Sequence, residues 1–217
     1  MKRPEKPEYG FATVFETLSE TIFPAPAALP APWTSRRRFP DPVARFREAL
    51  EAAHGEVRVV ETLDEALSEV AELLEEIGAE VVVADSEAPL ERFSLGAGRQ
   101  VARVSTHNAD PEAWRDLCAR ADAGVTSAEA LLAETGSLVV SSGPGRSRLV
   151  SLLPPVHIAV VPAERIETDL FTWLAARSGR WPANTVLVSG PSKTGDIEQT
   201  LSVGVHGPKR LVAILYD

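Results

Sequence analysis

The chain has 217 residues, of which 44% are hydrophobic and 24% are charged, as in a globular protein with one sizeable core. Its formal net charge of −9 disfavours nonspecific binding to nucleic acid. The sequence has no run of 18 apolar residues and no apolar core behind its polar first residues, so we expect neither a membrane span nor a secretory signal, and a cytoplasmic location.

Residues 1–42 are expected to form a proline-rich arm ahead of a single α/β domain at residues 43–217. Six prolines fall between positions 24 and 42. This density is incompatible with a continuous helix or a central strand, and it is typical of an extended arm with polyproline character. A disordered segment is the alternative.

Helix and strand signals alternate from Asp41 onward. Asp41 followed by Pro42 can cap and open a helix, and residues 62–65 form a capping box at the start of a second one. The apolar run at residues 81–84 is typical of a buried parallel strand. The alternation predicts α/β layers. We expect helices at 42–54, 62–77, 111–120, 128–133, 148–153, 169–176 and 196–201, and strands at 57–60, 81–84, 101–104, 123–125, 138–140, 156–161, 186–189 and 211–215.

The loop after the expected strand at 186–189 is the strongest candidate for binding chemistry. It combines backbone N–H groups, two hydroxyls and the ammonium of Lys193 ahead of an expected helix, which favours an anion site for a carboxylate or a phosphate. It also leaves the carboxyl end of a strand, where ligands bind in open α/β sheets. Lys193 precedes the second glycine, so the loop is not a P-loop, and an ordinary turn is the alternative. The candidate ligand-binding residues are Gly190, Ser192, Lys193, Thr194, Asp196 and Glu198.

Two further loops carry candidate site residues. Glu134 precedes Thr135 and Gly136 between an expected helix and an expected strand, and its carboxylate could act as a base or a nucleophile. Arg146 lies in the glycine-rich loop 143–148, and its guanidinium suits a carboxylate or a phosphate ligand. A solvated glutamate and a turn with surface arginines are the alternatives.

The histidines point to acid–base chemistry at one position only. His206 lies in the turn Gly204–Pro208, where it is a candidate acid–base group near neutral pH. His157 lies within an apolar strand, where we expect a buried, hydrogen-bonded histidine. The sequence contains no H-x-x-x-H or H-E-x-x-H spacing, and it predicts no metal site and identifies no cofactor.

The order of the motifs in the second half resembles the lactate utilization protein C family, whose shared module is the LUD domain. The resemblance covers roughly residues 44–217 and is densest from residue 120 onward. The residues that carry it are Gly124–Glu129, Ala133–Val139, Arg148–Val150, Leu153–Ile158, Ser189–Glu198 and Gly204–Pro208.

The resemblance implies a three-layer α/β/α sandwich with a mostly parallel central sheet, the fold of phosphosugar isomerases, glucosamine-phosphate deaminases and CoA transferases. It also implies a subunit of a multi-protein system that oxidises L-lactate to pyruvate. This system has two partner proteins, which are expected to carry iron–sulfur clusters. The single Cys118 fits a subunit without a cluster of its own. By analogy with the wider fold, Glu134, Lys193, Asp196 and Glu198 become the candidates for chemistry.

The expected function is therefore a subunit of such a lactate-oxidising system, with a small-anion site in the Gly190 loop. Two alternatives remain open. One is a free-standing transferase or isomerase that acts on an acyl-CoA or a phosphosugar. The other is a noncatalytic assembly subunit, in which the arm and the two early helices, at 42–54 and 62–77, whose outer faces are acidic, are docking surfaces.

Overall fold

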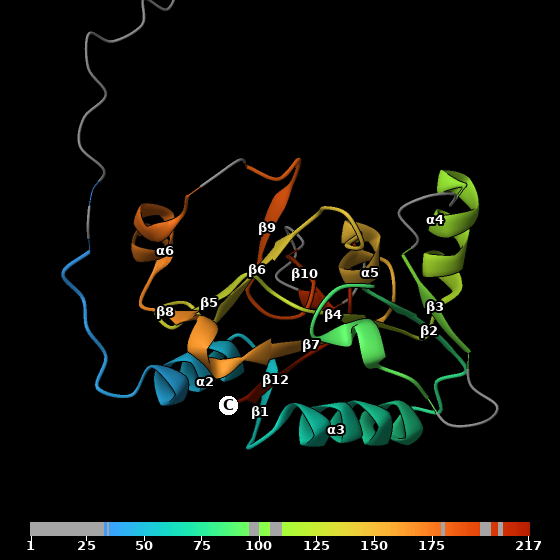
Figure 1. Cartoon of the computed structure of the whole chain (residues 1–217), viewed down its shortest axis with the longest axis horizontal. Coiled ribbons are helices and arrows are strands. Elements are labelled where there is room, and N and C mark those ends of the chain that lie inside the picture. Colours follow the sequence, from blue (N-terminus) through green and yellow to red (C-terminus); the bar gives the residue numbers. More distant parts are fainter. Residues whose placement is uncertain are drawn as a thin grey trace, which may run out of the picture. The chain divides into compact units, whose positions relative to one another are not determined.

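A computed structural model of the chain describes residues 33, 35–95, 100–104, 110–178, 181–195, 201–203 and 206–217. Thr34–Asp217 form one compact unit (Figure 1). Most of the expected arm lies outside the described residues. Residues 35–39 have no regular secondary structure, and helix α2 (Pro42–Ala52) begins at Pro42 with the side chain of Asp41 accepting a hydrogen bond from the backbone N–H of Ala44, as expected.

Six strands form a central sheet in which every neighbouring pair is parallel. Because all six run the same way, their carboxyl ends meet at one edge of the sheet and their amino ends at the opposite edge. In spatial order the strands are β1 (Glu56–Val60), β12 (Arg210–Tyr216), β7 (Val156–Pro162), β4 (Ala123–Thr126), β2 (Val81–Ala84) and β3 (Gln100–Arg103).

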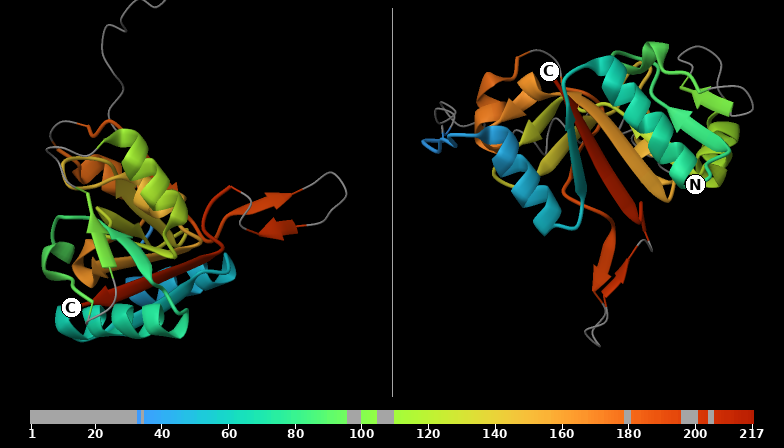
Figure 2. Two further views of the ribbon diagram at one scale, coloured as in Figure 1. Left: turned by 90° about the vertical axis from the view of Figure 1, so that its right-hand side faces the viewer. Right: turned by 90° about the horizontal axis from the view of Figure 1, so that it is seen from below.

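Helices cover both faces of this sheet, which confirms the expected α/β/α fold. On one face lies α3 (Leu63–Glu76), whose buried Val70 and Leu74 are four residues apart and pack on the central strands. Figure 2 shows this helix lying along the sheet. The opposite face carries α2, α4 (Pro111–Arg120) and α5 (Arg148–Leu152). No helix among the described residues is both long and apolar enough to cross a membrane.

A second sheet, which the sequence did not predict, packs beside α2 on that opposite face. Its strand order is β8-β5-β6-β9, with β5 pairing parallel to β8 and β6 running antiparallel to both β5 and β9. Its outer face is covered by α6 (Leu170–Ala176), whose Trp173 is buried. The strands are β5 (Ala130–Leu132), β6 (Ser137–Ser141), β8 (Ile166–Glu167) and β9 (Thr185–Val188).

The expected helix at residues 128–133 is wrong, because Ala130–Leu132 form strand β5. Ala and Leu favour a helix, but the run is short and apolar throughout, and periodicity does not distinguish the two states in such a segment. Leu131 packs toward the central sheet while Ala130 and Leu132 pack toward α6. Burial on both faces of a sheet therefore overrides the helical propensity.

The expected strand–loop–helix around Gly190 also differs from the structure. Strand β10 (Lys193–Gly195) pairs antiparallel with β11 (Leu201–Val203), forming a hairpin that projects from the body in Figure 2. Lys193 thus opens a strand, and Leu201 belongs to a strand instead of ending a helix. Residues 196–200, which make up the rest of the expected helix, lie outside the described residues.

Candidate functional site

The predicted Gly190 loop lies against the carboxyl end of helix α2. The ammonium of Lys193 donates a hydrogen bond to the carbonyl oxygen of Ala53, with 2.9 Å between the two atoms. Gly190 has a φ of +111°, and a Cβ at this position would come within 2.6 Å of the same oxygen. The cation therefore complements the negative end of the helix dipole, while Gly190 allows the backbone to approach the helix closely.

This loop sits at the amino edge of the central sheet. The backbone N–H of Ser192 donates to the carbonyl oxygen of Pro208 at 2.8 Å, and Pro208 precedes the first residue of β12. His206 is exposed in the same stretch of chain. The expected position at the carboxyl ends of the parallel strands is wrong, because β9 belongs to the second sheet. The side chain of Thr194 and both Asp196 and Glu198 lie outside what the structure describes.

Glu134 lies in the turn between β5 and β6. Its carboxylate forms an ion pair with Arg37, and its backbone oxygen accepts a hydrogen bond from Arg45 at 3.0 Å. The hydroxyl of Thr135 lies 2.6 Å from that of Ser137. Gly136 has a φ of +64°, and a Cβ there would come within 2.3 Å of the backbone nitrogen of Leu50.

Each of these groups is held by a contact within the protein. The helix end that Glu134 was expected to occupy is a hairpin turn between two strands. Gly136 is needed where this turn meets α2, because its left-handed backbone and the nearby helix leave no room for a side chain. The turn therefore has a clear structural role.

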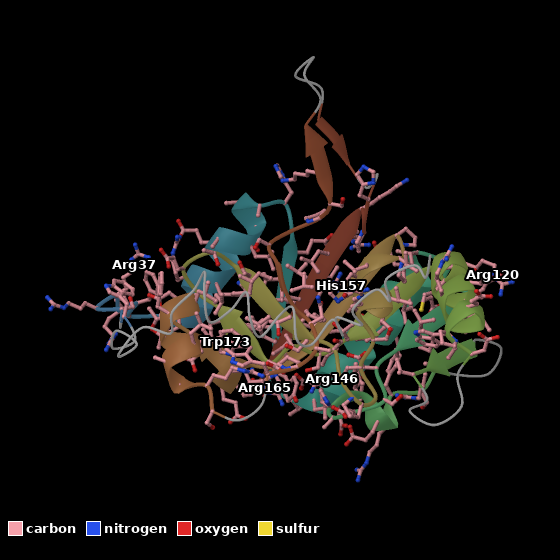
Figure 3. The ribbon with its side chains drawn as sticks, turned by 90° about the horizontal axis from the view of Figure 1, so that it is seen from above. Arg37, Arg120, Arg146, His157, Arg165 and Trp173 are labelled. Carbon is pink, nitrogen blue, oxygen red and sulfur yellow. The ribbon has the colours of Figure 1, made fainter. Side chains whose placement is uncertain are left out.

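Arg146 lies at the opposite end of the second sheet from the other predicted site residues. Strands β6 and β9 pair Leu138 with Val188 near Gly190, and Ser141 with Thr185 near Arg146. Three residues of strand, about 10 Å, separate the two ends. Figure 3 agrees, because Arg146 and Arg165, which follows β7, lie on the side away from the β10–β11 hairpin. The structure therefore does not bring Arg146 together with the Gly190 loop.

A cleft of about 520 Å³ opens beside Arg146. A second hollow of about 500 Å³ adjoins it and shares Ser142, Arg146 and Ala183. The cleft lies near the carboxyl edge of the central sheet, because the backbone N–H of Ser86, two residues beyond β2, donates to the carbonyl oxygen of Gly145 at 2.8 Å. Its lining residues include Glu129, Ser142, Arg146, Arg177 and Trp181.

Two arginines share one carboxylate in this cleft. Glu129 lies 2.5 Å from Nη1 of Arg177 and 3.7 Å from Nη1 of Arg146, and its side chain is 17% exposed. The guanidinium of Arg177 also lies over the rings of Trp173 and Trp181, at 5.2 and 4.7 Å from their centroids. With Glu87, whose carboxylate lies 3.2 Å from Nε of Arg146, the two arginines face two carboxylates and the group carries no net charge.

Both guanidiniums retain unused hydrogen-bonding capacity. Within the described residues, the buried Nε atoms of Arg146 and Arg177 have no hydrogen-bond partner. Nε of Arg146 lies 3.2 Å from a carboxylate oxygen of Glu87, which is close enough for an ion pair but is not aligned as a hydrogen bond. A planar carboxylate is the ligand that a guanidinium with free N–H groups binds best.

Asp85 lies directly behind this cleft, at the carboxyl end of β2. The residue is 2% exposed, and its carboxylate accepts hydrogen bonds from the backbone N–H groups of Ser147 and Ser127. Burial raises the pKa of Asp85 to about 7, against the opposing effects of these hydrogen bonds and of Arg146, while Glu87 raises it further. A carboxyl group that titrates near neutral pH therefore stands beside an arginine of the cleft.

The sequence contained part of the signal for this site. Asp85 directly follows the buried run at 81–84, and a polar residue at the carboxyl end of a parallel strand is a candidate ligand contact. Glu129 lies in a motif that carried the family resemblance, but nothing in that motif marked it as a site residue. Arg177 and Trp181 carried no such signal, because neither lies in a recognised motif.

His157 and Cys118 are both buried, and their surroundings favour a structural role for each. His157 is fully buried with Nε2 at 2.7 Å from the hydroxyl of Thr126, as expected for a sheet histidine, and burial lowers its pKa to about 4. Burial raises the pKa of Cys118 to about 11. Across the part of the chain that the structure describes, no group of three or more His, Cys, Asp or Glu could hold a metal ion.

Comparison with known proteins places most of the chain in one family. A sequence model described as LUD domain matches residues 43–216. A crystal structure of a DUF162 family protein from Deinococcus radiodurans shares the fold, with a TM-score of 0.57 and 22% identity. That match covers 81% of this chain and 96% of the other.

Several curated relatives carry the name lactate utilization protein C. The relative from Halalkalibacterium halodurans is 35% identical over 73% of this chain and 70% of its own length. The one from Shouchella clausii is 34% identical over 81% of this chain and 79% of its own length. The one from Exiguobacterium sp. is 45% identical, and there the match spans half of each protein.

Proposed function

The chain belongs to the LUD domain family, and on that basis we propose that it takes part in lactate utilization as a subunit that works with partner proteins. The names of its relatives, two of which match over more than two thirds of their length, support this role. The partners would carry the iron–sulfur clusters that accept electrons from lactate. A subunit without a cluster of its own fits a sequence with a single cysteine, whose thiol is buried.

The site we propose is the cleft between Arg146 and Arg177, and its ligand is a small carboxylate such as L-lactate or pyruvate. The observation that carries this proposal is the pair of half-buried arginine side chains that share Glu129 and keep unpartnered, buried Nε atoms. A monoanion would add one negative charge beside the two carboxylates that the arginines already balance. A dianionic phosphate would meet the carboxylates of Glu129 and Glu87 with a charge that the cleft does not balance.

A second candidate anion site is the Gly190 loop, for which the sequence pattern is the support. Lys193 is exposed there, close to Ser192 in the chain. The ammonium already has a partner in the carbonyl oxygen of Ala53. A ligand at this loop would therefore have to compete with the end of helix α2 for the ammonium. In the cleft, the side chains of Arg146 and Arg177 would have to turn for a ligand to reach their unpartnered Nε atoms, which are buried.

Isothermal titration calorimetry with L-lactate and pyruvate tests the choice between the two sites. We expect Arg146→Gln to weaken binding at least tenfold, because it removes a charge-assisted contact worth about 1.5–3 kcal/mol. Arg120→Gln is the matched control, since it removes an arginine from the exposed end of α4. Loss of binding in Lys193→Ala with retention in Arg146→Gln would move the site to the Gly190 loop.

The role in a multi-protein system has a separate test. Lactate-dependent dye reduction by the reconstituted partner proteins should require this chain, and Arg146→Gln should fail to restore the rate. If Arg146→Gln and Lys193→Ala both restore full activity, the chain is an assembly subunit without a working site. If the isolated chain turns over an acyl-CoA or a phosphosugar, the free-standing enzyme replaces the lactate role.

A further inference from the structure

We propose that Asp85 takes up a proton when a carboxylate binds at Arg146, so that the cleft binds its ligand together with a proton. This inference rests on the proposed carboxylate site and adds the uptake of a proton to the binding of the ligand. Asp85 would act as a positioning and charge-balancing residue behind the ligand, without touching it.

The geometry around Asp85 leaves one carboxylate oxygen available for a proton. The side chain accepts hydrogen bonds from the backbone N–H groups of Ser127 and Ser147, yet Oδ1 is buried and has no partner within the described residues. A buried carboxylate oxygen without a donor is costly, and protonation removes most of that cost. The residue is thus built to exist in both charge states.

Asp85 is also coupled to the cleft through the backbone. Ser147, which donates to its carboxylate, directly follows Arg146, and the neighbouring Ser86 donates to the carbonyl oxygen of Gly145 at 2.8 Å. The loop that carries Arg146 is therefore fixed to the segment that carries Asp85. A change in charge at either residue is felt by the other at short range.

Within the part of the chain that the structure describes, few charges face Asp85. Arg146 favours the ionised carboxylate and Glu87 disfavours it, while Glu129 acts through its ion pair with Arg146. Arg103, on β3, places Nη1 3.0 Å from the backbone carbonyl oxygen of Asp85. Arg146 lowers the pKa of Asp85, and it is also the residue that the ligand would contact.

A bound carboxylate would shift this balance toward the protonated state. The ligand brings a negative charge to Arg146 and offsets the cation that stabilises ionised Asp85. The pKa of Asp85, which burial holds at about 7, then rises, and a proton is taken up from solvent. By linkage, ligand affinity increases as the pH falls through this range, by up to about tenfold for each unit by which the ligand raises the pKa.

The experiment counts protons during L-lactate binding. Calorimetric titrations at pH 7 in two cationic buffers with different ionisation enthalpies, Bis-Tris and imidazole, give the number of protons exchanged. We expect the wild type to take up about half a proton, because Asp85 is about half ionised at this pH before the ligand binds. Affinity should fall several-fold between pH 6 and pH 8.5, a range in which L-lactate remains ionised.

The test variant is Asp85→Asn, which keeps a similar shape but cannot titrate. It should bind L-lactate with no proton uptake and with an affinity that is independent of pH. Asp122→Asn is the matched control, because Asp122 also accepts two backbone N–H bonds, from Glu80 and Val81 at 2.9 Å, but does so at the amino end of β2. This control should retain the proton uptake of the wild type.

The outcomes separate the two proposals. Lactate binding without proton uptake in the wild type, or unchanged uptake in Asp85→Asn, would overturn the role of Asp85 and leave the carboxylate site intact. Absence of L-lactate and pyruvate binding in the wild type would overturn both. If Asp85→Asn does not fold, the wild-type proton count measured from pH 6 to pH 8.5 decides the question: uptake that is largest near pH 7 and above supports the role of Asp85, and no uptake at any of these pH values overturns it.

Discussion

The two edges of the central sheet use arginine, lysine and carboxylate side chains in different ways. At the amino edge, Lys193 caps helix α2 and Gly190 lets the chain approach it, while Glu134, in a turn packed on the same helix, pairs with Arg37. At the carboxyl edge, Arg146 and Arg177 share one carboxylate beside a hollow, and their buried Nε atoms have no hydrogen-bond partner among the described residues. Polar groups that are mutually satisfied hold a fold together, whereas groups left partly unsatisfied are available to a ligand.

The largest expected effect concerns the packing of the β5–β6 turn on α2. We expect Gly136→Ala to destabilise the protein by about 4 kcal/mol, because φ is +64° and the new Cβ would lie 2.3 Å from the backbone nitrogen of Leu50. Gly78→Ala is the matched control, with the same φ and open space around the position, and should cost about 1 kcal/mol. Urea unfolding measures both, and equal losses would contradict a steric role for Gly136.

Acidification should destabilise the protein through His157. Its pKa is about 4 in the folded chain and about 6.5 when unfolded, so the unfolded state binds the proton first. The full stability is present above pH 6.5, where His157 is neutral in both states. As the pH falls from 6.5 to 4, the free energy of unfolding decreases by about 3 kcal/mol. Unfolding free energies across this window measure the effect. His157→Gln should flatten the dependence, and an unchanged slope in that variant would assign it to other groups.

Asp85 should give the opposite pH dependence. Its folded pKa of about 7 exceeds its unfolded value, so the folded state holds the proton more tightly. The contribution of Asp85 to the free energy of unfolding is therefore largest below about pH 4, and it is lost as the pH rises through 7. Asp85→Asn should be more stable than the wild type at pH 8, by about 2 kcal/mol, and this advantage should disappear at pH 5. A variant that is less stable at pH 8 would show that ionised Asp85 supports the fold.

The smallest effect is expected at Lys193. Lys193→Met keeps the length of the side chain and removes the cation at the carboxyl end of α2, and should cost about 0.5 kcal/mol. The loss should diminish at high salt, since the pair is exposed. Thermal unfolding at low and high ionic strength provides the comparison. A large loss of lactate binding with no change in stability would instead favour the Gly190 loop as the site.

Much of the fold could be predicted from local signals. Thr62 caps α3 and Asp41 caps α2 as the sequence indicated, and the buried run at 81–84 is a central parallel strand. The second sheet could not be predicted, because β5 consists of helix-forming residues whose state is set by partners distant in sequence. Without the second sheet, the strand before the Gly190 loop is expected in the central sheet, and the loop is expected at the carboxyl edge of that sheet.

Only part of the candidate site could be inferred from the sequence. Arg146 was a candidate on its own, but the residues beside it come from separate segments. Glu129 precedes β5, Arg177 follows α6 and Asp85 follows β2, and no local pattern indicates that the fold brings them together. Lys193 and Glu134 were conspicuous because they lie among glycines and hydroxyl residues, a composition that serves tight turns equally well.

Lactate titration of the backbone amide NMR spectrum tests the central claim most directly. L-lactate should shift the amide signals of residues 127–129, 142–147, 177–178 and 181–184, around the cleft. Signals of residues 190–195 and 206–209 should change little. A reversed pattern, with shifts confined to the hairpin and the amino edge, would contradict a ligand site in the cleft and place the ligand at the Gly190 loop.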